Sequence, residues 1–253
     1  MSRHRFFIPP DRWNAEDLRL EGEEAHHCTQ VVRCRPGDRV TVFDGSGTEA
    51  NVEIVTTTDQ LVTLRPLGMS RSVPLRSQLI LGQAVPKGKN MDLIVQKAVE
   101  LGASALMPLL SDRTVGRLDA DEAGKRRDKW QRNALEACKQ CGRNLVPDIA
   151  VPQTVTKALG ALGRPGPGEL RLIAAISPET LPLRELLAEH RENHGGDSPQ
   201  KVHIWIGPEG DFTPAELSQA LTAGFRPLSL GPIVLRSETA ALYALSVLGY
   251  ELL

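Results

Sequence analysis

Two short segments combine glycine, proline and glutamate directly after apolar stretches, and both could form part of a ligand site. The first is "IGPEGDFTPAEL" (206–217) and the second is "LGPIVLRSETA" (230–240). Glycine allows positive φ angles or a close approach of the backbone to a ligand, and proline stiffens a bend. Each glycine taken alone is also explained by a chain corner. The pair of segments, with one predicted helix between them, favours a pocket built from backbone loops.

The elements around these segments follow an α/β pattern. Within the first segment, Thr213 can cap a helix, Pro214 suits its first turn and Glu216 completes a capping box. From residue 78 onward, apolar strand-like runs alternate with helical patterns, which predicts a mostly parallel sheet with helices on both faces. Ligands of such sheets bind at the carboxyl ends of strands, where both segments are expected. The predicted strands are 78–85, 103–110, 171–177, 201–207 and 226–231, and the predicted helices are 89–102, 119–142, 182–190, 214–224 and 238–253.

The N-terminal part of the chain predicts a small β-rich unit. Residues 39–67 alternate apolar and polar side chains, and "DGSG" (44–47) is a hairpin signal. A short helix before these strands is expected to stop at Pro36-Gly37. The expected domains are therefore 1–70 and 78–253, with a linker at 71–77.

Composition and charge exclude several classes of protein. The 253 residues are 41% hydrophobic and 24% charged, with a formal net charge of −1, which is ordinary for a globular chain. Because no global basic field exists, any contact with nucleic acid must come from a local patch. No apolar run reaches the length of a membrane span, and the N-terminus lacks the apolar core of a signal peptide. The sequence predicts a cytoplasmic protein with no membrane partner.

The four cysteines, Cys28, Cys34, Cys138 and Cys141, do not form a metal-ligand pattern. The C-x-x-C at 138–141 has no second pair at zinc spacing, and the sequence around it is helical. We therefore expect two reduced thiols on a packed helix face, and no metal. Nucleotide motifs are missing as well, since neither a G-x-G-x-x-G before the first α/β helix nor a Walker A sequence occurs.

The two glycine segments together resemble the C-terminal signature of the SPOUT-class methyltransferases, and the whole chain resembles the RsmE family of 16S rRNA uridine N3-methyltransferases. "AHHCTQVVRCRPGD" and "FDGSG" are similar to the family's N-terminal RNA-binding domain. "GQAVPKGKNMDLIVQKAVELG" and "ALEACKQCGRNLVPDI" are similar to its central motifs. The resemblance implies a PUA-like β-barrel domain followed by an α/β domain with a C-terminal trefoil knot. Periodicity alone would not suggest the knot, because knots are nearly absent from protein folds.

The resemblance also implies the cofactor and the reaction. In proteins of this type the glycine loops bind S-adenosylmethionine (SAM), with adenine lying where a Cβ atom would clash. The methyl group then passes to N3 of a uridine in 16S rRNA. The cofactor-binding residues that the resemblance implies are Ile176, Ile206, Gly207, Pro208, Gly210, Leu230, Gly231, Ile233 and Leu235.

Methylation of N3 requires the departure of its proton, after which negative charge spreads to the flanking carbonyl oxygens. Arg236, inside the second glycine segment, could stabilise that charge. A structural role, in which this arginine pairs with Glu238 or with the helix end, is an equally good explanation. Glu209 or Glu238 could accept the proton, or could instead bond the amides of the loops. His27 and His203 are alternative bases, although neither lies in a glycine segment.

The expected partners are 16S rRNA or the small ribosomal subunit and a second copy of the chain. Residues 238–253 are apolar nearly all round, more than one intramolecular face can use, and this predicts a homodimer. The resemblance places the dimer interface beside the knot. The predicted RNA-binding residues are Arg3, Arg5, Arg33, Lys87, Lys89 and Arg143.

Two rival functions stay open at this point. One is an RNA-binding or assembly protein whose catalytic half has decayed, and the intact glycine segments argue against it. The other is a methyltransferase of the same class that acts on tRNA, and the long β-rich N-terminal domain argues against that.

Overall fold

The computed structural model describes residues 4–88, 90–114 and 118–253. The chain divides into two compact units, and each is described by itself. The sequence did not predict that residues 135–146 group with the N-terminal unit. The domain boundaries at 70 and 78 stay a prediction. The N-terminal unit comprises Met1–Pro74 and Leu135–Val146, and the C-terminal unit comprises Leu75–Ala134 and Pro147–Leu253.

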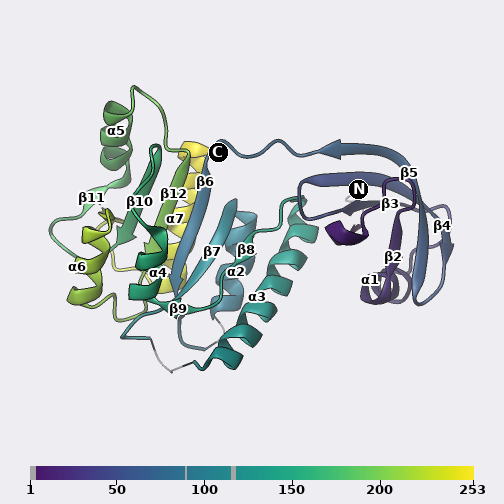
Figure 1. The fold of residues 1–253 in the computed structure, drawn as a ribbon, viewed down its shortest axis with the longest axis horizontal. Coiled ribbons are helices and arrows are strands. Elements are labelled where there is room, and N and C mark those ends of the chain that lie inside the picture. The colour runs from purple at the N-terminus through teal and green to yellow at the C-terminus, as the bar shows by residue number, and fades with distance from the viewer. Residues whose placement is uncertain (1–3, 89, 115–117) are drawn as a thin grey trace. The chain divides into compact units, whose positions relative to one another are not determined.

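The N-terminal unit is a five-stranded sheet that curls around its own apolar core (Figure 1). The strand order is β1-β3-β4-β5-β2, with β1 parallel to β3 and the other pairs antiparallel. The predicted hairpin is confirmed, because residues 44–47 join β3 to β4 and the Asp44 carboxylate accepts the amides of Ser46 and Thr48. The strands are β1 (Arg5–Phe7), β2 (Arg19–Glu21), β3 (Arg39–Phe43), β4 (Thr48–Thr57) and β5 (Leu61–Arg71), and a 3₁₀ turn covers Pro10–Arg12.

The helical segment between β2 and β3 ends in a strained backbone. Helix α1 (Gly22–His26) continues into a π-helical turn (His27–Val31), so the helix stops before the proline that was expected to end it. Arg33 then takes a φ of +61°, a left-handed conformation that costs a side chain with a Cβ roughly 1–2 kcal/mol. The Cys34 amide closes this corner by donating to the Cys28 carbonyl at 2.9 Å. The corner leaves Arg33 exposed to solvent.

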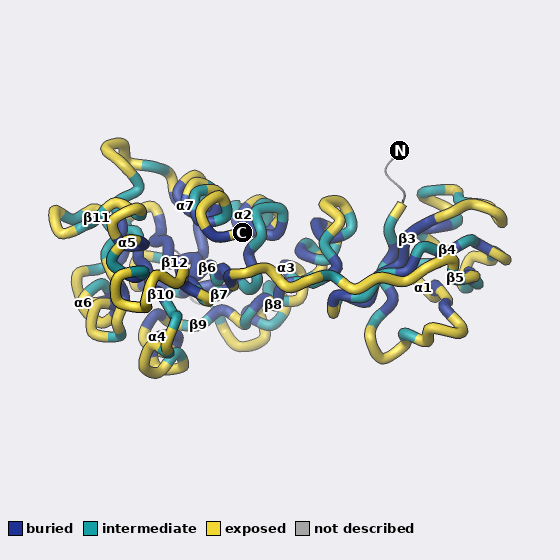
Figure 2. Tube along the Cα trace, turned by 90° about the horizontal axis from the view of Figure 1, so that it is seen from above, coloured by how far each residue is buried: buried dark blue, intermediate teal, exposed yellow. Residues whose placement is uncertain are grey.

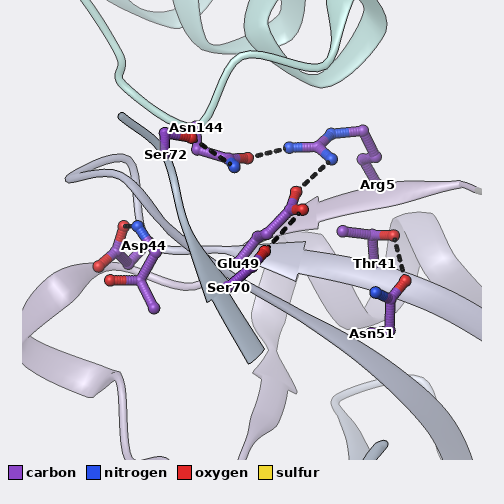
Figure 3. A network of polar contacts seen from close by, with 9 residues as sticks. Arg5, Thr41, Asp44, Glu49, Asn51, Ser70, Ser72 and Asn144 are labelled. Carbon is purple, nitrogen blue, oxygen red and sulfur yellow. Dashed lines mark hydrogen bonds and ion pairs between the residues drawn. The ribbon is translucent and has the colours of Figure 1, made fainter. Parts of the chain in front are cut away.

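Arg5 is the centre of a polar network inside the N-terminal unit (Figure 3). Its guanidinium pairs with Glu49 at 3.0 Å, donates to the side chain of Asn144, and lies 5.0 Å from the centre of the Phe43 ring. The Asn144 amide donates in turn to the Ser72 hydroxyl at 3.0 Å. Together with the ion pair of Lys139 and Glu24, these bonds join residues 135–146 to the rest of the N-terminal unit.

The C-terminal unit is built on an eight-stranded sheet in which neighbouring strands run parallel. The order is β11-β13-β10-β12-β6-β7-β8, and β9 also pairs with β7. This arrangement confirms the mostly parallel sheet that the alternating pattern predicts. The strands are β6 (Gln78–Ala84), β7 (Ala103–Leu110), β8 (Asp148–Ile149), β9 (Gln153–Thr154), β10 (Glu169–Ala174), β11 (Leu181–Pro182), β12 (Lys201–Ile206) and β13 (Arg226–Ser229).

Helices cover both faces of this sheet (Figure 1). Helices α2 and α7 pack against each other on one face, and α4 and α6 pack together on the other, over Trp205 and Phe225. Buried segments follow the strands, whereas the helices expose their outer sides (Figure 2). Among the described residues, no helix is both long and apolar enough to span a bilayer. The helices are α2 (Asn90–Glu100), α3 (Ala120–Cys141), α4 (Val155–Leu162), α5 (Leu183–Asn193), α6 (Pro214–Thr222) and α7 (Ser237–Leu252), and the end of α3 from Leu135 onward belongs to the N-terminal unit.

Two predictions about local structure need correction. The sequence patterns missed α4, which begins at the Thr154 cap, and also missed strands of two or three residues, because such elements are too short for periodicity. The two thiols of the C-x-x-C do not share a packed face. Cys138 is buried, but Cys141 is the last residue of α3 and is exposed. All four cysteines are free thiols.

A charged cluster is buried where β10 and β12 begin. The Arg171 side chain is 1% exposed and donates to Glu169 at 2.5 Å. It also donates to the carbonyls of Gly163 and Ala223, at the ends of α4 and α6, and so ties both helices to the sheet. The His203 ring lies 3.6 Å from the same carboxylate. Burial lowers the pKa of His203 to about 4 against the attraction of Glu169, so the imidazole is neutral at pH 7.

We expect this histidine to make the protein less stable as the pH falls from about 6.5 to about 4. An unfolded histidine titrates near 6.5, so over this window the folded state binds fewer protons and the free energy of unfolding declines. The full effect of His203 is on the order of 3 kcal/mol. When the free energy of unfolding is measured by urea titration at several pH values in this range, it should decline less steeply with falling pH for His203→Gln than for the wild type. Equal slopes would contradict the assignment.

Candidate functional site

A cavity of about 440 Å³ opens at the carboxyl ends of β10, β12 and β13. Three loops line it, drawn from residues 174–180, 206–211 and 228–237. The last two contain the glycine segments, which the fold therefore brings to the same place. In parallel α/β sheets this end of the strands is where ligands bind.

Most of the predicted pocket residues line the cavity. Gly210 does not line the cavity. A Cβ at that position would instead face the Arg113 side chain at 3.4 Å. Aliphatic residues dominate the walls, and Ile176 and Ile233 are about three-quarters exposed at the rim (73% and 74%). The predicted residues that line the cavity are Ile176, Ile206, Gly207, Pro208, Leu230, Gly231, Ile233 and Leu235.

Gly207 and Gly231 are required by different features of the structure. A Cβ at Gly207 would lie 2.9 Å from the Asp211 carboxylate and 3.1 Å from the Phe212 amide, so the tight loop itself excludes a side chain. Gly231 has a φ of +109°, which L side chains rarely adopt, and the space beside it is open. Chain geometry therefore explains Gly207, whereas Gly231 combines a corner with free room in the cavity.

Asp211 fastens the first glycine loop to a neighbouring loop, and sequence reasoning missed this role. Its φ of +60° is left-handed, a conformation that aspartate tolerates better than most residues. One carboxylate oxygen accepts the Phe212 amide at 2.7 Å, and the other accepts the Ile176 amide at 3.2 Å. The loops after β10 and β12 are thus joined beside the cavity. The positive φ cannot be read from a single aspartate in the sequence.

The predicted capping box at the start of α6 is confirmed. The Thr213 hydroxyl accepts the Glu216 amide at 3.2 Å, and the Glu216 carboxylate accepts the Thr213 amide at 2.9 Å. The same buried carboxylate also accepts the Ser111 hydroxyl at 3.0 Å and the Asp112 amide at 2.9 Å. Arg113 adds a bond to the carbonyl of Gly210 at 2.5 Å. The loop after β7 therefore clamps the first glycine loop.

The catalytic candidates divide into two groups. Arg236 and Glu209 line the cavity, whereas Glu238 does not. Within the described residues, Arg236 has no ion-pair partner, so the structural pair with Glu238 is not formed. Glu209 accepts the amide of Lys87 at 3.1 Å. Of the alternative bases, His203 is buried in the cluster described above and does not line the cavity. His27 packs edge-on against Phe6 in the N-terminal unit.

The predicted RNA-binding residues have different environments. Arg33 and Lys87 are exposed, while the Arg5 side chain is only 14% exposed and is used inside its own unit. Burial lowers the pKa of Arg143 from its ordinary value, although a guanidinium remains charged at neutral pH. Arg3 and Lys89 lie outside the described residues.

Comparison with known families decides what kind of protein carries this site. Residues 73–249 match the RNA methyltransferase domain family, and residues 20–67 match the RNA methyltransferase PUA domain family. A Bacillus subtilis relative named ribosomal RNA small subunit methyltransferase E is 30% identical over 253 residues, which covers 98% of this chain and 96% of the relative. The chain belongs to the ribosomal RNA small subunit methyltransferase E family. The resemblance predicted from the sequence is confirmed.

Two solved structures, one of them a member of the ribosomal RNA small subunit methyltransferase E family, share the fold. A Neisseria gonorrhoeae member bound to S-adenosyl methionine matches with a TM-score of 0.84 and 28% identity, covering 99% of this chain and 98% of that one. A Legionella pneumophila protein in complex with bound SAM matches with a TM-score of 0.86 and 30% identity, over the same shares of the two chains. The predicted fold class, an α/β methyltransferase domain after an N-terminal PUA domain, is confirmed. The trefoil knot stays a prediction.

Proposed function

We propose that this protein transfers a methyl group from SAM to N3 of a uridine in 16S ribosomal RNA. The observation that carries the proposal is the cavity at the carboxyl ends of β10, β12 and β13, where both glycine segments and Arg236 meet. We infer the RNA substrate from the names of the relatives, and the cofactor from the SAM bound in two similar structures. An rRNA substrate would place the protein in the cytoplasm.

The cavity suits SAM in size and in the chemistry of its walls. A volume of about 440 Å³ is usual for a small-molecule site. Aliphatic side chains such as Ile206, Leu228 and Leu235 can enclose a flat aromatic base. The open space beside Gly231 is a cradle that a side chain at this position would fill. When bound, SAM supplies an electrophilic methyl group.

Arg236 is our choice for the residue that stabilises the uridine as its proton departs. A guanidinium does not titrate in the working range, so it offers a permanent positive charge to the uracil oxygens. Arg236 is also the N-cap residue of α7, where the helix dipole adds positive potential. Since nothing described in the structure pairs with its charge, the guanidinium is available to substrate.

Glu209 is the better of the two proposed proton acceptors, because it lines the cavity and Glu238 does not. A carboxylate can accept about four hydrogen bonds, so its bond to the Lys87 amide leaves capacity for the N3 proton. Covalent activation of the base by a cysteine is disfavoured, because the four cysteines all lie outside the cavity lining. In addition, burial raises the pKa of Cys28 and of Cys138 to about 12.

For RNA binding we propose direct phosphate contacts by Arg33 and Lys87, whose side chains are exposed. The strained backbone at Arg33 supports this, since a costly conformation persists where something other than stability requires it. Arg5 is better explained as a residue that orders the loop around Asn144. Roles for Arg3, Lys89 and Arg143 stay proposals from the sequence.

We also propose that the active form is a homodimer that pairs through α7. The helix buries one face against the sheet, but the opposite side exposes Thr239, Tyr243, Ser246 and Tyr250. Tyr243 and Tyr250 are 49% and 89% exposed, and such large aromatic rings are typical of protein interfaces. A second copy would cover this surface by a symmetric contact.

Replacing Arg236 with alanine should reduce turnover far more than cofactor binding. If the guanidinium stabilises developing charge, kcat should decrease by about 10²-fold, on the order of 3 kcal/mol. Calorimetry should find the Kd for SAM within a few-fold of the wild type. Arg236→Lys, which keeps a charge but not the planar fork, should retain part of the rate. Unchanged kcat in Arg236→Ala would exclude the proposed role.

Arg33→Gly should weaken RNA binding without destabilising the fold. Glycine takes the left-handed backbone freely, so the free energy of unfolding should stay equal or rise by about 1 kcal/mol. The Kd for an rRNA fragment should rise, and its dependence on salt should weaken by about one counterion. Arg65→Ala is the control, because it also removes one exposed charge from the same unit, where Arg65 pairs with Glu53. If both variants lose the same RNA affinity, the effect comes from net charge and the specific role of Arg33 is wrong.

Light scattering at micromolar concentration should give the mass of two chains. Tyr250→Asp should shift the mass toward one chain, because a charge on the exposed side of α7 opposes symmetric pairing. A fully active monomer of the wild type would rule out the dimer proposal.

The product of the reaction tests the function itself. Unmodified 16S rRNA treated with the protein and SAM should yield 3-methyluridine when its nucleosides are separated by mass spectrometry. The same assay without SAM is the control. A base methylated at carbon 5, a ribose methylated at the 2′ oxygen, or methylation of tRNA in preference to rRNA would each contradict the proposal. Failure to bind SAM would favour the rival RNA-binding protein without catalysis.

A further inference from the structure

A chain of buried hydrogen bonds links three distant segments beside the cavity. The side-chain amide of Gln83 donates to the Ser237 hydroxyl at 2.9 Å, and that hydroxyl donates to the Gly207 carbonyl at 2.7 Å. Gln83 also donates to the carbonyl of Ala84 at 2.9 Å. Gln83 is 0% exposed and Ser237 is 5% exposed. Ser237 and Gly207 line the cavity, and Gln83 stands behind them.

The parallel sheet explains why these residues meet. Gln83 pairs in register with Ile206, the last residue of β12 before Gly207. Its neighbour Gly82 faces the opposite side of the sheet, where a Cβ would come within 2.2 Å of the Trp205 ring. Because side chains alternate along a strand, Gln83 must point to the face that α7 covers. Ser237 is the first residue of that helix.

Stability alone accounts poorly for a glutamine at this place. Within the described part of the chain, the Gln83 side-chain oxygen is buried without a hydrogen-bond partner. A buried acceptor left unpaired is costly, and an aliphatic side chain of similar size would avoid that cost. The Ser237 hydroxyl, in contrast, uses its single proton on Gly207 while accepting from Gln83. The arrangement directs one hydrogen bond at one backbone carbonyl of the pocket loop.

We infer that Gln83 and Ser237 are positioning residues that set cofactor affinity by orienting the peptide after Gly207. Orientation of this carbonyl determines where Pro208 and the next residues stand, and these form one wall of the cavity. The same bonds hold Ser237, the first residue of α7, against the end of β12. This inference rests on the proposed function, because SAM is the ligand whose affinity is measured.

Ser237→Ala and Gln83→Met test the inference in the full chain. Each variant removes donors while keeping nearly the same volume, and each should raise the Kd for SAM about tenfold by calorimetry. The KM for SAM should rise in parallel, whereas kcat at saturating SAM should change by less than about threefold. Ser237→Thr keeps the hydroxyl and should bind SAM like the wild type. Thr222→Val is the control, since it removes an exposed hydroxyl at the end of α6, where that hydroxyl bonds only to the Ser218 carbonyl of its own helix.

The double variant gives a second test. If both side chains act through one carbonyl, Gln83→Met should add little to the loss already caused by Ser237→Ala. Thermal unfolding without ligand separates affinity from folding, and all variants should melt within a few degrees of the wild type. Should Ser237→Ala fail to fold, Ser237→Cys applies the same test, because a thiol donates weakly.

The outcomes are distinguishable. A wild type that binds SAM with a Ser237→Ala variant of equal affinity overturns the inference and leaves the proposed function standing. Independent, additive losses in the double variant also overturn it. A wild type that binds no SAM removes the proposed function, and the inference with it.

Discussion

One buried carboxylate holds the site together. Glu216 is 4% exposed and accepts hydrogen bonds from Thr213, Ser111 and Asp112. A carboxylate in this environment is tolerated only because several donors surround it. Two of those donors belong to the loop after β7, so the same group that caps α6 also anchors the glycine loop to a neighbouring strand. This anchor fixes the end of the glycine loop at the start of α6.

Around that anchor, the first glycine loop is bonded to three further segments of the C-terminal unit. Asp211 joins it to the loop after β10, Glu209 joins it to the amide of Lys87, and Ser237 joins it to α7. A loop fixed from several sides loses little further entropy when a ligand enters, and this favours affinity. The glycines therefore form a rigid backbone surface, although their residue type alone would suggest mobility.

Long elements and local motifs were predictable from the sequence, because their signals lie within a few residues. The capping box of Thr213 and Glu216 and the two glycine loops at strand ends are of this kind. What could not be predicted depends on contacts between distant residues. The glutamine behind the pocket has no local signature, and the internal use of Arg5 follows from Asn144, 139 positions away. Two-residue strands such as β8 are too short for any period to show.

The bond between Gln83 and Ser237 closes a separation of 154 residues. Contacts of such range form late, because the entropy of closing a long loop must be overcome before they contribute. The cavity is complete only when α7 is docked, because Arg236, Ser237 and Ala240 at the start of this helix line it. A ligand that fills it binds the finished topology alone, and at a free concentration of 100 times its Kd it stabilises that state by about 2.7 kcal/mol. The concentration of free cofactor in the cell therefore affects what fraction of the enzyme is folded.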